Sequence, residues 1–134
     1  MIQAHSPTLL EAPKQDFKQD IRAYFDRIAP ELDRWSRRNR YYYNDLARLH
    51  RFIIPPGSRV LEVGCGTGDL LQATEPSIGV GIDFAPAVVA IAAQKYPHLS
   101  FYTLDAETLD PGQLAPEHRQ FDYIILSGVL GYLG

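Results

Sequence analysis

The sequence predicts an α/β fold built on a doubly wound parallel sheet, with helices in front of it. The prediction starts from four short apolar runs, which begin at Val60, Ile78, Leu99 and Phe121 and each bring a polar group to their carboxyl ends. A parallel sheet binds its ligand in the crevice outside those carboxyl ends. We therefore expect a ligand site where the ends of the four runs come together.

The first run continues into a glycine-rich turn. Residues 60–71 read VLEVGCGTGDLL, with glycines at 64, 66 and 68 and an acid, Glu62, just before the turn. Glycine permits positive φ and removes side chains that would keep the backbone away from a ligand. For this segment alone, a tight strand-to-helix turn without a ligand is the alternative interpretation.

The second run ends in an acid, and this acid indicates a ligand that contains a ribose. Asp83 lies nineteen residues after Gly64, an offset at which an acid reaches the ribose hydroxyls of a bound nucleotide. A dinucleotide fingerprint needs its third glycine at position 69, which is Asp69. A carboxylate at this helix N-terminus repels a pyrophosphate, so NAD is disfavoured. A nicotinamide-dependent oxidoreductase is the least favoured alternative.

Two segments, LEVGCGTG and GIDFAP, together resemble the class I S-adenosylmethionine-dependent methyltransferases. The resemblance runs from about Ser58 to the last residue. It implies a Rossmann-like fold of seven strands, of which this chain has the first four, and S-adenosyl-L-methionine as the cofactor. That cofactor carries no phosphate, so Asp69 is compatible with it.

The resemblance also implies a cofactor-binding set at the four strand ends. The set comprises Glu62, Gly64, Cys65, Gly66, Gly68, Asp83, Phe84, Asp105, Ala106 and Ser127. By resemblance, the glycines approach the methionine and ribose, Asp83 takes both ribose hydroxyls, and Phe84 packs on the adenine. Asp105 accepts from the adenine amino group, and Ser127 lies near the methyl group. Ordinary helix capping is the alternative for the acids.

No catalytic residue is assigned, because the sulfonium of the implied cofactor already activates the methyl group and a base is optional. Cys65 is the single cysteine, and no histidine lies near it in sequence to activate it as a nucleophile. We interpret it as a small residue tolerated in a crowded turn. One cysteine excludes an intramolecular disulfide, and the His and Cys spacing predicts no metal site.

The N-terminal part differs in character from the rest of the chain. We expect residues 1–56 to form a helical cap or lid, and residues 57–134 to form the cofactor-binding α/β unit. Apolar spacing predicts helices over 14–28 and 31–53, separated at Pro30. Their apolar faces are expected to include Phe17, Ile21, Tyr24 or Phe25, Ile28, Leu32, Trp35, Leu46, Leu49 and Ile53.

By resemblance, this helical segment covers the cofactor and contributes to substrate choice. Tyr24, Arg37 and the tyrosines at 41–43 are the candidates for that role. The arginines and aromatics of RWSRRNRYYYN also form a candidate anion or nucleic-acid face, against a solvated helix face as the alternative. A net charge of −3 makes nucleic acid an unlikely partner.

Composition fits a compact domain of 134 residues, 46% hydrophobic and 22% charged. The N-terminus does not resemble a secretion signal, and the longest apolar stretch has 12 residues, too few to span a membrane as a helix. We therefore expect a cytoplasmic protein without a membrane span.

The expected function is S-adenosylmethionine-dependent methyl transfer to an unidentified acceptor, with this chain supplying the cofactor-binding half. The acceptor is a small molecule or a glycan or lipid-linked compound. A non-catalytic cofactor-binding module completed by a partner is the alternative. Because the fold stops after its fourth strand, we expect that strand, residues 121–126, to form an unprotected sheet edge through which the chain can form a homodimer.

Overall fold

The computed structural model describes residues 15–127. They form two N-terminal helices followed by a parallel sheet with its own connecting helices. The helical part comprises α1 (Gln15–Arg38) and α2 (Arg40–Ile53). The sheet unit comprises β1 (Arg59–Val63), α3 (Asp69–Ala73), β2 (Ile78–Asp83), α4 (Pro86–Lys95), β3 (Ser100–Thr103), the 3₁₀ helices η2 (Ala106–Thr108), η3 (Pro111–Gln113) and η4 (Pro116–His118), and β4 (Tyr123–Leu126).

The described residues form a four-stranded sheet in the order β3-β2-β1-β4, with every pair parallel. The chain winds outward from β1 to β3 and then returns to the other side of β1. Glu62 of β1 therefore has Gly81 of β2 on one side and Ile125 of β4 on the other. This order confirms the doubly wound α/β fold, and it puts the topological switch point between β1 and β4.

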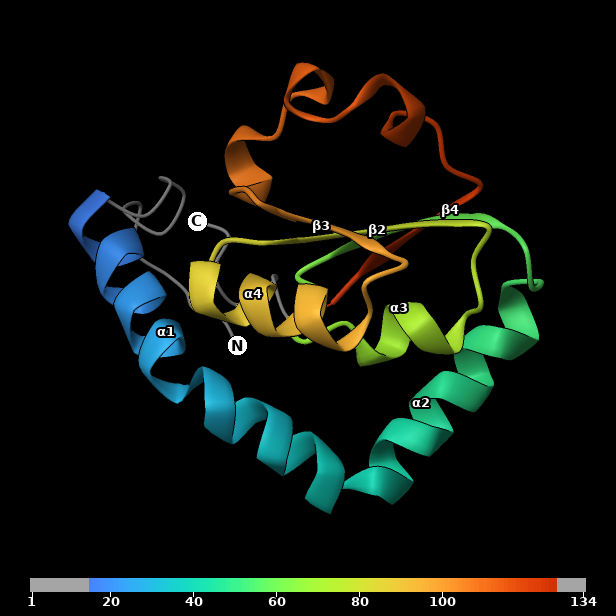
Figure 1. Cartoon of the computed structure of the whole chain (residues 1–134), viewed down its shortest axis with the longest axis horizontal. Helices are drawn as coiled ribbons and strands as arrows, with labels where there is room; N and C mark the ends of the chain where they lie inside the picture. The colour runs from blue at the N-terminus through green and yellow to red at the C-terminus, as the bar shows by residue number, and fades with distance from the viewer. Residues whose placement is uncertain (1–14, 128–134) are drawn as a thin grey trace, which may run out of the picture.

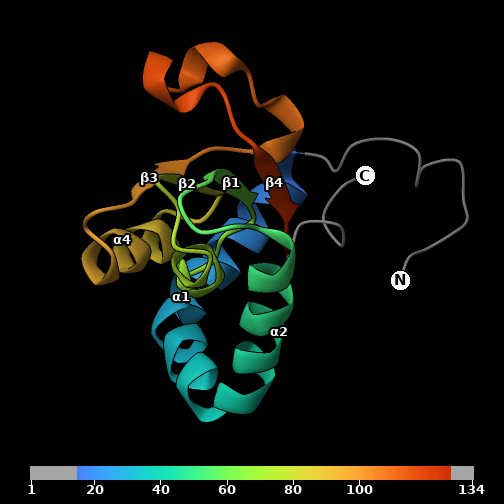
Figure 2. The same cartoon turned by 90° about the vertical axis from the view of Figure 1, so that its right-hand side faces the viewer.

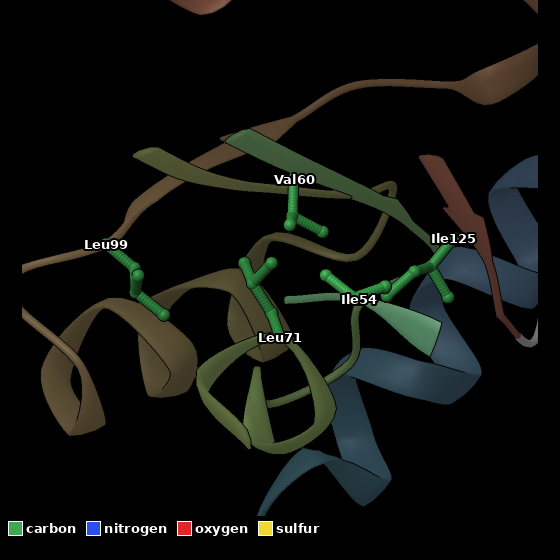
Figure 3. Close-up of a cluster of buried hydrophobic side chains, with 5 residues drawn as sticks. All are labelled: Ile54, Val60, Leu71, Leu99 and Ile125. Atoms are coloured by element: carbon green, nitrogen blue, oxygen red, sulfur yellow. The ribbon is translucent and has the colours of Figure 1, made fainter. Parts of the chain in front are cut away.

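Each face of the sheet is covered by a different kind of structure. In Figure 1, α3 and α4 lie on one face and the 3₁₀ helices between β3 and β4 lie on the other. The α3 side encloses a core of Ile54, Val60, Leu71, Leu99 and Ile125 (Figure 3). The opposite side encloses Leu61, Val63, Val80, Ile82 and Leu114. The alternation along β1 sends Val60 and Leu61 to opposite cores, as expected for a strand buried on both faces.

The expected helix boundary at Pro30 is wrong, because α1 continues through it to Arg38. Proline lacks an N–H and crowds the preceding turn, which weakens a helix there without always ending it. Here the preceding turn is held in place from outside. Ala29 is fully buried against Ala85, which precedes α4, and against Val88 of α4. Asp26 Oδ1 accepts the backbone N–H of Ala87 at 2.9 Å.

The expected apolar faces of the two helices are only partly confirmed. Among the side chains that the structure describes, Tyr24, Leu49 and Ile53 are each about half exposed or more, whereas Ala29 and Ala47 are buried. The helix α1 packs on α4 and α2 packs on α3, and the small side chains at these two positions allow the backbones to come close. Lys14, the first residue of the expected helix, lies outside the described residues.

Two further expectations concern membranes and the sheet edge. No helix within residues 15–127 combines the length and the apolarity needed to cross a bilayer. The strand β4 forms one edge of the described sheet, as expected. Its side chains Ile124 and Leu126 are 62% and 61% exposed, so this edge carries uncovered apolar surface.

The core on the α3 side generates a stability prediction. Leu71 is fully buried at the centre of that core, so Leu71→Ala should lower the free energy of unfolding by about 2 to 5 kcal/mol. The matched control, Leu49→Ala, removes the same atoms from a position 56% exposed and should change it by less than about 0.5 kcal/mol. Urea denaturation of both variants makes the comparison, and equal losses would contradict the described core.

Candidate functional site

The glycine turn is tied to the end of β2. The N–H groups of Gly64 and Cys65 both donate to the carbonyl of Ile82, at 2.8 and 3.0 Å. Gly64, Gly66 and Gly68 have φ of 81°, 57° and 87°, the left-handed region that glycine adopts without strain. The three alternate glycines are therefore required by the path of the backbone, which confirms the conformational part of the prediction.

Two of these glycines face different surroundings. A Cβ built on Gly68 would lie 2.9 Å from the Phe101 ring and 3.2 Å from that of Tyr96, so this glycine is packed from behind. A Cβ on Gly66 would meet no atom within 4 Å. The turn is thus closed against the sheet unit at Gly68 and open at Gly66.

Glu62 is a buried carboxyl group at the switch point. It is 2% exposed, and its Oε1 has no hydrogen-bond partner among the described residues. Burial raises the pKa of Glu62 to about 8, hydrogen bonds with the Ser127 side chain and the Leu71 backbone oppose the shift, and the charges of Asp83 and Asp69 add to it. Glu62 therefore joins the end of β1, the start of α3 and the end of β4, with one oxygen still able to accept a hydrogen bond.

Asp83 closes the turn from the side of β2. Its Oδ2 accepts the backbone N–H of Gly66 at 3.0 Å, and its Oδ1 accepts that of Ala85 at 3.2 Å. Burial raises the pKa of Asp83, and the backbone hydrogen bonds oppose that shift. A carboxylate has about four acceptor positions, and the backbone of Gly66, Ala85 and Phe84 hydrogen-bonds to this one, so the side chain holds the loop and keeps some capacity to bind a hydroxyl-bearing ligand.

Cys65 is buried and turned toward the sheet. A Cβ on Gly81 would lie 2.8 Å from its Sγ, so the thiol fills the space above β2. Burial raises the pKa of Cys65, and the neighbouring Glu62 and Asp83 charges raise it further. A thiol in this state is a poor nucleophile, which favours the interpretation of Cys65 as a small residue in a crowded turn.

The remaining predicted residues follow β2 and β3. The carbonyl of Phe84 accepts the Nε–H of Arg22 at 3.0 Å. Asp105 caps η2 by accepting the N–H of Glu107 at 2.9 Å, and Ala106 packs against the core that contains Leu61. The structure thus joins Glu62, the glycine turn, Asp83 and Ser127 through direct contacts, and places Asp105 and Ala106 after β3.

Sequence reasoning missed two polar groups that hold this region. Asp69, the first residue of α3, accepts from Lys95 Nζ at 2.7 Å, from the Tyr96 hydroxyl at 2.5 Å and from Thr67 Oγ1 at 3.2 Å. On α1, Arg22 and Asp26 bind the segment that follows Asp83. No spacing in the sequence indicates either group, because the partners lie 26 to 62 residues apart.

The candidate covering residues belong to the two helices of the N-terminal part. The α1–α2 junction, which includes Arg37 and the tyrosines at 41–43, lies at the far end of the helical part from the sheet (Figure 1 and Figure 2). The reason is that α1 is fixed along α4 and runs away from the sheet beyond that contact. Tyr24 is half exposed, with the Arg27 guanidinium 5.8 Å from its ring centroid.

A parallel sheet that carries an acid and a glycine turn at its switch point is typical of proteins that bind a nucleotide-type cofactor. Residues 61–134 match the model of a methyltransferase domain family. The chain belongs to this family, which confirms the class I S-adenosylmethionine-dependent methyltransferase expected from the sequence.

Related sequences carry methyltransferase names. The chain is 34% identical over 98 residues to a 2-phytyl-1,4-naphtoquinone methyltransferase of Thermosynechococcus vestitus, covering 65% of this chain and 44% of that protein. It is 29% identical over 83 residues to a demethylmenaquinone methyltransferase of Oceanobacillus iheyensis, covering 58% and 35%. The chain thus spans less than half the length of these curated relatives.

Solved structures share the fold. A magnesium protoporphyrin IX methyltransferase from Synechocystis PCC 6803 with bound S-adenosylmethionine matches with a TM-score of 0.55 at 24% identity, covering 91% of this chain and 66% of that one. A TehB-like S-adenosylmethionine-dependent methyltransferase from Corynebacterium glutamicum matches at 0.53 and 24%, covering 76% and 58%. These likenesses support the fold.

The two glycine environments generate a prediction. Gly66→Ala introduces a side chain at φ 57° into open space, so it should lower the free energy of unfolding by about 1 to 2 kcal/mol from backbone strain alone. Gly68→Ala adds a steric overlap with Phe101 and should cost at least about 1 kcal/mol more. Thermal or urea denaturation gives the order, and a larger loss at Gly66 would show that the turn is packed differently.

Proposed function

We propose that this chain binds S-adenosyl-L-methionine at the β1–β4 switch point and takes part in methyl transfer to a small apolar acceptor. The observation that carries the proposal is Glu62, a carboxyl group 2% exposed whose Oε1 has no partner among the described residues. A buried polar atom without a partner is costly. A cationic group from a ligand at this place offsets that cost, and the amino group of S-adenosylmethionine is one.

The other predicted residues receive roles consistent with their positions. Asp83 accepts from the ribose hydroxyls, because its carboxylate keeps acceptor capacity beside the glycine turn. Gly66 lets the backbone approach the ligand, since nothing occupies the space that its Cβ would fill. In the same arrangement, Gly64 and Gly68 shape the turn, Cys65 fills its inner side, and Phe84 lies against the adenine.

Asp105, Ala106 and Ser127 complete the proposed set. Leu104 N–H donates to the carbonyl of Asp83 at 3.0 Å, so the segment that carries Asp105 and Ala106 runs beside the ribose-binding residue. We assign both to the adenine end. Ser127 interacts with Glu62 and is the described residue at the carboxyl end of β4, where the methyl group would be presented.

The bound cofactor supplies an activated methyl group on a sulfonium. The residues of the chain orient that group and exclude water from it. Alignment of the acceptor with the methyl group raises the rate by several orders of magnitude. Glu62 would hold the amino group of the methionine part and Asp83 the ribose, and the sulfonium carries the methyl group between these two parts of the cofactor. No described residue is needed as a base in this account.

We propose an apolar, ring-shaped acceptor of the quinone type. Ile124 and Leu126 of β4 are exposed apolar side chains directly before Ser127, which suits an apolar acceptor better than the glycan considered from the sequence. Relatives named for naphthoquinone and menaquinone substrates point the same way. The comparisons give no support to a cofactor-binding module completed by a partner.

The helical part, residues 1–56, is proposed as a fixed wall rather than as a freely moving lid. Arg22, Asp26 and Ala29 attach α1 to the segment between Asp83 and Val88, and its first turns lie beside the sheet end that leads into α4 (Figure 1). A cytoplasmic location and a homodimer formed through the β4 edge stay proposals. The second follows from the unpaired outer side of β4 in the described sheet.

Calorimetric titration tests the cofactor assignment. S-adenosylhomocysteine should bind the chain, and NAD at the same concentrations should give no heat, because Asp69 leaves the α3 N-terminus unfit for a pyrophosphate. Asp83→Ala should weaken S-adenosylhomocysteine binding by roughly tenfold to more than a hundredfold, as expected for loss of about 1.5 to 3 kcal/mol of charge-assisted hydrogen bonding.

Asp122→Ala serves as the matched control, since this aspartate binds only the opposite end of β1, through the N–H of Arg59. It should leave cofactor affinity within about twofold of the parent. Undiminished affinity of Asp83→Ala would remove the ribose assignment, and a clear heat for NAD with none for S-adenosylhomocysteine would overturn the proposed function.

A further inference from the structure

The outer side of α2 carries large apolar side chains that the cofactor site does not use. Tyr41 is 90% and Phe52 88% exposed, and Leu49 and Ile53 are 56% and 57% exposed. Single exposed apolar residues are ordinary. Several on one helix of 14 residues form a patch, and large exposed apolar patches mark interaction sites.

Helical geometry sorts these residues into one stripe. At 3.6 residues per turn, Tyr41, Phe52 and Leu49 fall on one side of α2, and the buried Ala47 falls on the other. Arg48 borders the apolar stripe next to Tyr41, and Arg51 and Arg40 continue from there toward the side of Ala47. Asp45 falls within the stripe, between Phe52 and Leu49. In Figure 2, α2 stands on the outside of the molecule, and it joins α1 at the end remote from the sheet.

The charge around this stripe is strongly one-sided. Exposed arginines occur at 37, 38, 40, 48 and 51, whereas Asp45 is the single acid between positions 37 and 54. Asp45 contacts Arg48 at 3.3 Å, with both side chains 75% exposed, so solvent screens this pair. From Pro55 onward the chain has nine acids against three Lys and Arg. The molecule therefore presents its positive side together with its exposed apolar helix.

We propose that this α2 surface, defined by Tyr41, Leu49, Phe52, Ile53 and the adjoining arginines, docks on an anionic lipid bilayer. An amphipathic helix with aromatic and aliphatic residues on one side and arginines beside them lies in the plane of a membrane interface. Tyrosine and phenylalanine enter the headgroup region, and arginines are attracted to anionic headgroups. The inference is independent of the proposed acceptor.

Two other partners match the surface less well. A second copy of the chain would bring its own arginines against those of the first, and like charges facing each other across an interface are unfavourable. A nucleic acid offers phosphates and stacking faces but no apolar layer for Leu49 and Ile53. A bilayer surface supplies both negative charge and an apolar layer.

Co-sedimentation with vesicles tests the proposal on the intact chain. The protein should bind vesicles rich in phosphatidylglycerol much more tightly than vesicles of phosphatidylcholine, and salt should weaken that binding. Replacing Arg48 and Arg51 together by Gln should lower the partition coefficient by roughly tenfold to thirtyfold. Phe52→Ser should lower it by about tenfold.

Matched controls make the same changes elsewhere. Arg27→Gln removes an exposed arginine from the middle of α1, and Ile124→Ser removes an exposed apolar side chain from β4. Both should bind vesicles as the parent does, and S-adenosylhomocysteine affinity should be unchanged in the α2 variants.

Three outcomes would overturn the proposal. The first is equal binding to both kinds of vesicle, or none. The second is an equal loss of binding in the control variants. The third is a dimer that Phe52→Ser dissociates in the absence of vesicle binding, which would assign the surface to a second copy of the chain.

Discussion

A carboxyl group buried at the switch point between β1 and β4 is the constraint on which the rest of the structure depends. Glu62 is held by the end of β4 through Ser127 and by the start of α3 through the Leu71 backbone. Its pKa of about 8, against 4.5 in its ordinary state, means that the folded chain binds this proton more tightly than the unfolded chain. The unfolding free energy from this group is therefore fully present below about pH 4.5 and declines as the pH rises toward 8.

The burial of Glu62 without a full set of hydrogen bonds is consistent with a binding site rather than with a purely structural acid. A structural acid in a core is expected to have all its oxygens satisfied, whereas Oε1 of Glu62 has no partner among the described residues. The turn around it is rigidly supported by Ile82, by Asp83 and, behind α3, by the contact of Asp69 with Lys95 and Tyr96. Such support keeps the turn in one conformation before a ligand arrives, which lowers the entropic cost of binding.

The parts of the fold that could be predicted from sequence are those encoded locally. Val60 and the following glycines specify a strand, a turn with positive φ and a helix start within a dozen residues. Asp83 was found because its offset from the turn is fixed by one strand–helix–strand unit. Those features needed no knowledge of tertiary contacts.

The features that were missed depend on residues far apart in sequence. Pro30 indicated a helix end, and only the packing of Ala29 on α4 shows why the helix continues. The large apolar residues of α2 suggested a buried face, yet Leu49 and Ile53 are more than half exposed, whereas Ala47 is buried in this helix, which packs on α3. Arg22 is recognisable as a supporting residue only once its bond to the Phe84 carbonyl is seen.

The most direct test is a titration of the Glu62 side chain by carbon-13 NMR, with Glu62→Gln to assign the signal. Without ligand, the carboxyl group should titrate near pH 8, as its burial requires. With S-adenosylhomocysteine bound, the midpoint should fall well below that value, because the ligand's amino group favours the charged carboxylate. A midpoint near 4.5 without ligand, or one that the ligand leaves unchanged, would contradict the account of Glu62 as the buried acceptor at the switch point.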